Sequence, residues 1–296
     1  MAVIALRSAW DRRHKCIEEF ECLKQKEQEQ EQEQEQEQEQ GRVDLYESLN
    51  MKAQRARSPA LLNTISELPR TLMEIGALSM SMPLLRSLPA GDGHPVMLIP
   101  GFMASDTSML VLARYLRHLG YKTLGWELGR NTGHPDTLHS DLANRFETVV
   151  RDAEVPVTLI GQSLGGVYSR EIARKYPDHV RQVITLGSPF SMSGSDGSNG
   201  LVRRSFEQQS GVSVEQMRER FADDSSPPVP LTAIYSKGDG VVHWRGCMEK
   251  DEDAITQNIR VPGSHCGMGV NPIIYRIVAD RLSQRVGEWA KYKSAI

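Results

Sequence analysis

Short apolar runs, separated by longer stretches with helical spacing, dominate the chain after residue 90. Runs that are apolar at nearly every position are typical of strands buried in a parallel sheet, and the stretches between them are long enough for connecting helices. The pattern predicts an α/β fold with a mostly parallel central sheet flanked by helices. The predicted strands are Pro95 to Ile99, Tyr121 to Trp126, Val157 to Ile160, Val180 to Leu186 and Leu231 to Tyr235, and the predicted helices are 106–119, 137–153, 164–175 and 271–285.

The alternation of strands and helices is interrupted at residues 190–230. This interval begins with a stretch rich in Ser and Gly and ends with closely spaced prolines. Between these ends it contains apolar residues, Phe206 and Phe221 among them, that are suited to covering an apolar ligand. We expect residues 190–230 to form an inserted cap or lid within a domain of residues 91–296.

Two N-terminal regions differ from the predicted sheet domain. Residues 27–40 alternate between Glu and Gln, so residues 1–40 are expected to form a solvated or marginally helical tail, with an acidic interaction arm as the alternative. Residues 41–90 are expected to form helices that pack on the sheet domain, with attachment to a membrane surface as the alternative. The apolar positions with helical spacing are Leu61, Ile65, Leu68, Leu72 and Ile75, and Pro69 is expected to open a second helix.

The overall charge and the absence of long apolar segments narrow the classes of partner. With 35 Lys and Arg against 38 Asp and Glu, the formal net charge is -3, so no global positive field is available to hold nucleic acid. No apolar run approaches the roughly 18 residues that a membrane span needs, and the N-terminus has no secretory pattern. We expect a soluble, cytoplasmic protein that acts on a small molecule, with peripheral contact to a membrane as an open alternative.

The four cysteines are Cys16, Cys22, Cys247 and Cys266. Their spacing fits neither a dense disulfide framework nor a paired metal-binding motif, so buried or incidental thiols are the simplest interpretation. The sequence leaves open whether Cys247 and Cys266 pair. It predicts neither a metal ion nor a cofactor.

A Gly-x-Ser-x-Gly pattern at residues 161–165 is the first candidate for chemistry. Chance alone would produce this pattern in about one chain of this length in ten, because Gly and Ser each make up about 7% of residues. The context is more specific, since a predicted buried strand runs into the motif and a helical pattern follows it. Such a turn exposes the serine at the end of the sheet, and the two glycines allow strand and helix to approach closely. Ser163 is therefore the predicted nucleophile.

A serine hydroxyl needs a histidine that takes its proton. Three histidines follow Ser163 in the chain. His265 lies in a glycine-rich loop before the last predicted helix and is the predicted base, whereas His179 precedes a strand and is expected in a surface turn. His243 is kept as a residue of the pocket wall or of the structure.

The histidine in turn needs a carboxylate that holds its tautomer and stabilises its charged form. Asp239 lies in the loop directly after a predicted strand, which is the position expected of this acid. Asp251 and Asp253 are alternatives, but they fall in an acidic run that is typical of a solvated surface.

Acyl transfer also requires N–H donors for the oxyanion. The backbone N–H of Leu164 follows the nucleophile, and the second donor is expected from Phe102 in the loop after the first strand, with Met103 as the alternative. Apolar residues near these positions are suited to an acyl pocket, although any core would contain them. They are Phe102, Met103, Met192, Trp244 and Met268.

Taken together, four motifs resemble bacterial α/β-hydrolases of the lipase and esterase type, over about residues 91–289. The matching stretches are 93–102, 161–166, 236–242 and 263–265. The resemblance implies the α/β-hydrolase fold, and it implies a triad and an oxyanion hole in agreement with the residues chosen above. The implied triad is Ser163, Asp239 and His265, and the implied oxyanion donors are Phe102 and Leu164.

The predicted function is metal-independent hydrolysis of carboxylic esters through an acyl-enzyme on Ser163. Gln162 departs from the resemblance, because lipases commonly carry His or Trp there, and this bears on pocket shape and not on the triad. An acyltransferase that uses an alcohol or thiol in place of water fits the same residues. A binding module without catalysis is less favoured, because no triad member is missing.

Overall fold

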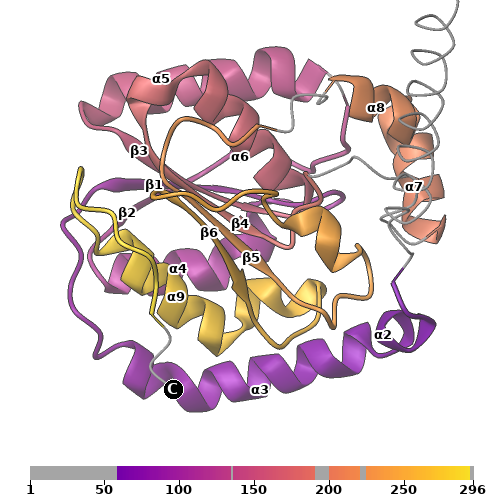
Figure 1. Cartoon of the computed structure of the whole chain (residues 1–296), viewed down its shortest axis with the longest axis horizontal. Helices are drawn as coiled ribbons and strands as arrows, with labels where there is room; N and C mark the ends of the chain where they lie inside the picture. The colour runs from indigo at the N-terminus through magenta and orange to yellow at the C-terminus, as the bar shows by residue number, and fades with distance from the viewer. Residues whose placement is uncertain (1–58, 135, 191–199, 221–224, 294–296) are drawn as a thin grey trace, which may run out of the picture. The chain divides into compact units, whose positions relative to one another are not determined.

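The computed structural model describes residues 59–134, 136–190, 200–220 and 225–293 (Figure 1). The tail predicted for residues 1–40, the first part of the segment predicted for 41–90, and the cap residues Met192 and Phe221 lie outside these ranges. Within them, six strands form one sheet in the order β2-β1-β3-β4-β5-β6, and each neighbouring pair is parallel. The prediction of a parallel central sheet is confirmed.

The strands form where the sequence has apolar runs. β1 (Pro95–Ile99), β4 (Val180–Leu186) and β5 (Leu231–Tyr235) coincide with the predicted ranges. β2 (Lys122–Gly125) and β3 (Val157–Gln162) differ from them by one or two residues at their ends. Every residue of β1 and β5 is buried, because helices cover both faces of the sheet.

The strand β6 (Thr256–Arg260) was missed by the sequence analysis. It lies at the edge of the sheet and pairs with β5 along one side. Its residues Gln257 and Asn258 are polar and partly exposed, so the strand lacks the apolar run that identified the others.

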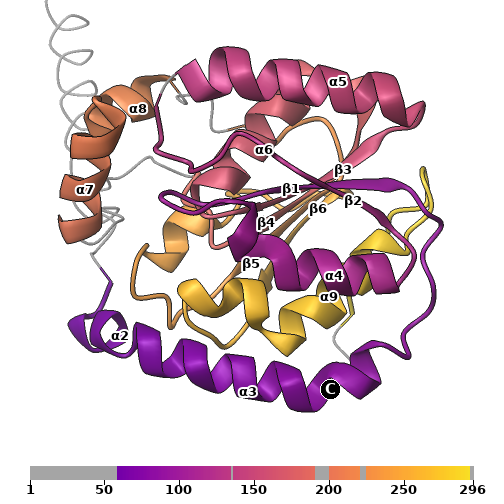
Figure 2. The same ribbon diagram turned by 180° about the vertical axis from the view of Figure 1, so that it is seen from behind.

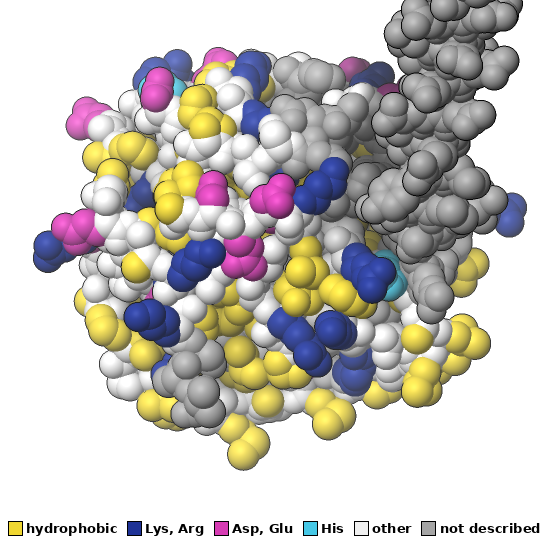
Figure 3. Space-filling model, in the orientation of Figure 1, with side chains coloured by type: hydrophobic (Ala, Val, Ile, Leu, Met, Phe, Trp, Pro, Cys, Tyr) yellow, Lys and Arg dark blue, Asp and Glu magenta, His cyan; other side chains and the backbone are white. Residues whose placement is uncertain are grey.

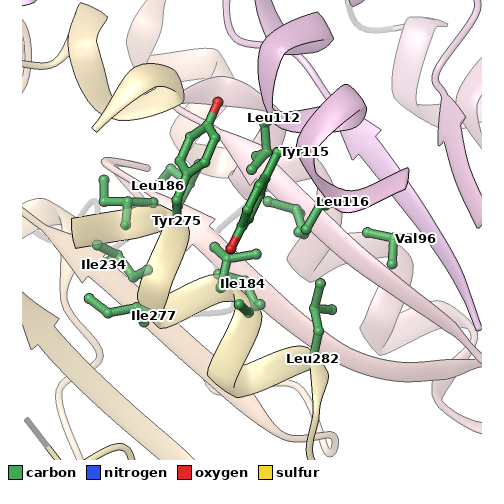
Figure 4. Packing of buried hydrophobic residues seen from close by; sticks show 14 of the residues in the cluster. Val96, Leu112, Tyr115, Leu116, Ile184, Leu186, Ile234, Tyr275, Ile277 and Leu282 are labelled. Carbon is green, nitrogen blue, oxygen red and sulfur yellow. The ribbon is translucent and has the colours of Figure 1, made fainter. Parts of the chain in front are cut away.

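Helices pack on both faces of the sheet (Figures 1 and 2). α4 (Leu110–His118) and α9 (Pro272–Leu282) lie on one face, and α5 (Ala143–Ala153) and α6 (Leu164–Lys175) lie on the other. Figure 4 shows the core of the first face, where the rings of Tyr115 and Tyr275 pack with centroids 4.9 Å apart. Shorter helical turns are η1 (Asp106–Met109), η2 (Thr137–Leu142), η3 (Pro177–His179), η4 (Trp244–Cys247) and η5 (Cys266–Val270).

In the described residues before the sheet, the chain forms α2 (Leu61–Ile65) and α3 (Glu67–Leu85). Pro69 lies in the first turn of α3, where its missing N–H costs no intrahelical hydrogen bond. The inner face of α3 packs against α9 and η5 and buries Leu78 and Leu85.

The outer face of α2 and α3 carries a row of exposed large apolar side chains, visible as yellow atoms along the edge of Figure 3 that corresponds to these helices. They are Leu61, Leu62, Ile65, Leu68, Leu72, Met73, Ile75, Met80 and Leu84. No helix in the described ranges is both long and apolar enough to cross a membrane.

The described part of the interval between β4 and β5 forms α7 (Gly200–Ser210) and α8 (Val214–Arg220). Both views place them on the same side of the molecule as α2 (Figures 1 and 2). Phe206 of α7 packs edge to face against Phe102, with ring centroids 5.3 Å apart. This contact connects the inserted helices to the loop that follows β1.

Candidate active site

Ser163 lies at the sharp turn between β3 and α6. Its backbone has φ 51° and ψ -123°, a conformation that a residue with a side chain rarely adopts. The turn is held by the N–H of Ser163, which donates to the carbonyl oxygen of Leu186 at 2.8 Å. The helix begins immediately after the serine, so Ser163 stands at the N-terminus of α6.

The two glycines of the motif are required by close backbone approach. A Cβ atom on Gly161 would lie 2.3 Å from the carbonyl oxygen of Gly165, and one on Gly165 would lie 2.2 Å from that of Ile99. Backbone atoms cannot swing away as a flexible side chain can. The sequence pattern therefore reflects the packing of helix α6 on the ends of β1 and β3.

Asp239 and His265 come from two loops that follow β5 and β6. The Nδ1 atom of His265 lies 2.6 Å from Oδ2 of Asp239, and both side chains are buried. The other carboxylate oxygen accepts hydrogen bonds from the N–H groups of Val241 and Val242, at 2.9 and 2.8 Å. These bonds fix the carboxylate, so it can hold the imidazole with Nε2 directed away from it.

The electrostatic environment favours the charged form of this imidazole. Burial alone would lower the pKa of His265, but the charge and hydrogen bond of Asp239, together with the charge of Glu67, outweigh burial and raise the pKa. A base that becomes positively charged during the reaction is stabilised by such surroundings.

The alternatives considered for acid and base lie elsewhere. His179 is exposed in η3, directly before the first residue of β4. Asp251 and Asp253 are exposed, and the carboxylate of Asp253 accepts the N–H of Ile255 in its own loop. His243 lies against the ring of Trp244, with centroids 5.6 Å apart.

Phe102 and Leu164, whose backbone N–H groups are the predicted oxyanion donors, line a cavity together with Ser163. Leu164 is the first residue of α6, so its N–H has no acceptor within the helix. The N–H of Phe102 donates to no residue in the described ranges, whereas that of Met103 donates to the carbonyl oxygen of Asn131 at 2.6 Å. Of the two candidates in the loop after β1, Phe102 is thus the one with a free donor.

Two cavities meet at Ser163. The narrower one, of about 590 Å³ including the space open to solvent, is lined mostly by apolar side chains from the loop after β1, from α7 and α8, and from the loop after Asp239, with Arg203 of α7 also at its wall. The wider one, of about 1130 Å³, also contains His265. Apart from Ser163, both cavities are lined by Phe102, Val202 and Val241. Ser163 therefore borders a mostly apolar space and lines the wider cavity together with His265.

Comparisons with known proteins agree with this geometry at the level of the fold. No protein-family model matches the chain. The monoacylglycerol lipase of Paleococcus ferrophilus superposes with a TM-score of 0.50 at 12% identity, over 66% of this chain and 96% of that one. The chain has the α/β-hydrolase fold. Lipase B of Aspergillus fumigatus gives a TM-score of 0.48 at 17% identity, over 65% of this chain and 53% of the other.

One curated protein is similar in sequence to part of this α/β-hydrolase chain. It is the pimeloyl-[acyl-carrier protein] methyl ester esterase of Pectobacterium carotovorum subsp. carotovorum (strain PC1), which is 33% identical over 96 residues. The match covers 31% of this chain and 36% of the esterase. The chain thus matches about a third of the length of that relative.

Within the α/β-hydrolase fold, the residues predicted for the acyl pocket separate. Met103 lines the wider cavity at its rim. Trp244 stacks on Tyr235, with ring centroids 5.8 Å apart, and it lines neither cavity that contains Ser163. Met268 is buried in the core and also lines neither of them, while Met192 lies outside the described residues.

Further residues around the site were not singled out from the sequence. Asn131 is fully buried, and its side-chain amide donates to the carbonyl oxygen of Pro100 at 2.9 Å, so it fixes the loop that carries Phe102. Gln162, noted for its departure from lipases, donates from Nε2 to the carbonyl oxygen of His265 at 3.3 Å. Glu67 is the third, and its contacts are described below.

The cysteines do not compete with Ser163 in this fold. Cys247 and Cys266 are free thiols, so they do not pair. Partial burial and nearby carboxylates raise the pKa of Cys266 to about 11, which keeps this thiol protonated at neutral pH. In the described ranges, no group of three or more His, Cys, Asp or Glu side chains is arranged to hold a metal ion.

Proposed function

We propose that this protein hydrolyses carboxylic esters through an acyl-enzyme on Ser163. The observation that carries the proposal is the buried Asp239–His265 pair beside a serine on a strained turn, at the junction of an apolar and a wider cavity. This combination supplies a nucleophile, an oriented base and a binding space for an acyl group.

In the proposed reaction, the hydroxyl oxygen of Ser163 attacks the acyl carbon while Nε2 of His265 takes the hydroxyl proton. The oxyanion of the tetrahedral intermediate accepts hydrogen bonds from the N–H groups of Phe102 and Leu164. The intermediate then collapses, and the alkoxide leaves with the proton from His265. A water molecule attacks the acyl-enzyme by the same route, which releases the acid and restores the serine.

The narrower cavity is the proposed acyl site, and α7 and α8 form the cap over it. Val202 and Phe206 of α7 and Val214 and Met217 of α8 line this cavity. A mostly apolar lining matches a hydrocarbon chain better than a charged acyl group.

The role of the cap is tested by Phe206→Ala, which opens the apolar cavity. The variant is expected to change the ratio of kcat/KM between long-chain and short-chain esters more than it changes kcat/KM for the short esters alone. An unchanged ratio together with a lower melting temperature would make Phe206 a core residue with no part in substrate binding.

The proposed function is tested by incubating the full chain with p-nitrophenyl esters of increasing acyl length and with methyl esters, which the name of the curated relative suggests. Turnover of one of these series and a mass increase on Ser163 after fluorophosphonate treatment are expected. Absence of both would overturn the proposal. Added alcohols serve to separate hydrolysis from acyl transfer, because only an acyltransferase would form a new ester in preference to the free acid.

The predicted cytoplasmic location and the predicted peripheral contact with a membrane stay predictions. The predicted membrane contact would involve the exposed apolar side chains of α2 and α3. Cosedimentation of the full chain with lipid vesicles, compared with a Leu68→Asp/Leu72→Asp variant, measures it.

A further inference from the structure

Glu67, the first residue of α3, is buried although it carries a charge. Its Oε1 atom accepts hydrogen bonds from the N–H groups of Gly240, at 2.8 Å, and of His265, at 3.0 Å. Its Oε2 atom accepts the N–H of Cys266 at 3.0 Å. Arg70, one turn further along the helix, makes an ion pair with it at 3.0 Å.

These contacts connect the two loops that carry the acid and the base. Gly240 follows Asp239 directly, and the other two donors are the base itself and the residue after it. Glu67 is 173 residues from Gly240 and 198 residues from His265 in the chain. One carboxylate from the N-terminal helix therefore holds both sides of the Asp239–His265 hydrogen bond.

The rest of α2 and α3 strengthens this connection. The hydroxyl of Thr64 donates to the carbonyl oxygen of Gly240 at 2.7 Å, and Glu74 accepts the N–H of Ser264 at 2.6 Å. A Cβ atom on Gly240 would lie 2.5 Å from backbone atoms of Asn63, so the acid loop approaches α2 in a way that only glycine permits. The two helices thus contact both the Asp239 loop and the His265 loop.

We propose that Glu67 is a positioning residue, whose carboxylate sets the relative position of the Asp239 and His265 loops. The inference rests on the proposed function, because it assigns these two residues their roles. A carboxylate suits this position since it accepts all three N–H groups at once, whereas an amide has one oxygen and would turn its NH₂ group towards a backbone donor.

Glu67 also acts on His265 through its charge. Burial lowers the pKa of His265, and Asp239 is the main influence that raises it. The charge of Glu67 is a further raising influence. The other charged or titratable groups around this position are Arg70, Glu74 and the protonated thiol of Cys266. Removing the charge of Glu67 should therefore lower the pKa of His265 and move the acidic limb of the activity profile to lower pH.

Two substitutions separate charge from position. Glu67→Gln keeps the size and removes the charge, and Glu67→Asp keeps the charge and shortens the reach by one methylene group. We expect both to lower kcat by about 10- to 100-fold with little change in KM, because small misplacements of catalytic groups have effects of this size. Only Glu67→Gln should move the acidic limb, and Glu67→Asp should keep it near the wild-type pH.

A matched control is Glu249→Gln, which removes a buried carboxylate that pairs with Arg170 and accepts the hydroxyl of Ser226. It should destabilise the protein at least as much as Glu67→Gln and leave the acidic limb in place when both are assayed well below their melting temperatures. A Glu67→Gln variant with wild-type kcat and an unmoved limb, or an equal shift in Glu249→Gln, would overturn the inference.

A readout that needs no substrate distinguishes failure of this inference from failure of the proposed function. The His265 imidazole can be titrated by NMR in the full chain carrying Ser163→Ala, with and without Glu67→Gln. A lower pKa in the double variant supports the positioning role even if no ester is turned over. An unchanged pKa and unchanged imidazole chemical shifts would contradict it, whatever the activity of the wild type.

Discussion

The sheet carries an Asp–His pair at each of its two ends, and only one of them belongs to the proposed active site. At the carboxyl ends of the strands, Asp239 contacts His265. At the opposite end, His94 immediately precedes β1, and its Nδ1 atom lies 2.5 Å from Asp92. The Nε2 atom of His94 lies 3.0 Å from the hydroxyl of Thr158 in β3, so at this end a carboxylate, an imidazole and a hydroxyl are linked in line.

The electrostatics of the two pairs are opposite. The pKa of His94 is lowered, because burial dominates and the charge of Arg181 adds to it, against the hydrogen bond and charge of Asp92. Asp92 is half-exposed and also forms an ion pair with Arg181 at 2.8 Å. Asp239 is buried, and no Lys or Arg in the described residues forms an ion pair with it; its charge and hydrogen bond raise the pKa of His265.

The two hydroxyl groups differ in access. Thr158 lies within β3, is fully buried and lines neither cavity at the site. Ser163 lies on a strained turn at the junction of two cavities. A carboxylate, an imidazole and a hydroxyl in hydrogen-bonding order thus do not define a catalytic site. The hydroxyl must also be accessible, and the carboxylate must be free of competing cations.

Replacing the two hydroxyl groups should give the largest difference between the two ends. Ser163→Ala is expected to lower kcat by a factor on the order of 10⁵ to 10⁶, because triad members act as a unit. Thr158→Val should keep most of the activity and cost about 1–3 kcal/mol of stability, because the Nε2 atom of His94 loses its buried partner. Ester turnover and urea unfolding measure these effects, and substantial loss of turnover in Thr158→Val would break the distinction.

Replacing the two carboxylates should give the next largest difference. Asp239→Asn is expected to lower kcat by about 10⁴-fold, because the amide can hold the wrong tautomer of His265. Asp92→Asn should leave kcat near the wild-type value and cost about 1 kcal/mol or less, since Asp92 is half-exposed and screened by solvent. Equal loss of kcat in the two variants would show that the Asp92 pair supports catalysis from a distance.

The sequence predicts the buried strands and the residues at their carboxyl ends well. Strands β1 and β5, buried along their whole length, are apparent as apolar runs, and Ser163 is identified by glycines that the turn requires. Asp239 was chosen from its position after a strand and His265 from its position before the last helix, and Oδ2 of Asp239 lies 2.6 Å from Nδ1 of His265. In each case the local sequence contains the constraint that fixes the structure.

The features that were missed depend on contacts between distant segments. Glu67 resembles any acidic residue in the first turn of a helix, and its role arises from loops 173 and 198 residues away. β6 is a polar edge strand whose pairing with β5 is not apparent from its composition. Trp244 was predicted for the acyl pocket as an apolar residue near the site, and its ring stacks on that of Tyr235.

The pH dependence of activity sharpens the comparison further. His265 must be neutral to accept the proton of Ser163, and its pKa is raised from an ordinary value of 6.5. The acidic limb of kcat/KM should therefore have its midpoint above pH 6.5 in the wild type. His94→Asn should leave that midpoint unchanged. A midpoint below the ordinary histidine value, or one that moves in His94→Asn, would contradict the assignment of the limb to His265.

The smallest expected effect is on stability, where the two histidines should act in opposite directions. The pKa of native His94 lies below its ordinary value of 6.5, so in the window between these two values the unfolded chain binds more protons, and stability falls as the pH falls. The pKa of native His265 lies above 6.5, so its contribution is present below 6.5 and is lost as the pH rises through the native pKa. Each contribution amounts to about 1.4 kcal/mol for every unit by which the native and unfolded pKa values differ.

Urea unfolding between about pH 5 and pH 8, the range in which histidine titrates, separates the two contributions. His94→Asn should reduce the loss of stability on the acidic side of this range, and His265→Asn should reduce the loss on the alkaline side. Because the two substitutions lie at opposite ends of the sheet and share no contact in the described residues, their effects should add in the double variant. A loss on the acidic side that disappears in His265→Asn but persists in His94→Asn would reverse the electrostatic roles of the two pairs, and with them the reason why only one end of the sheet is suited to catalysis.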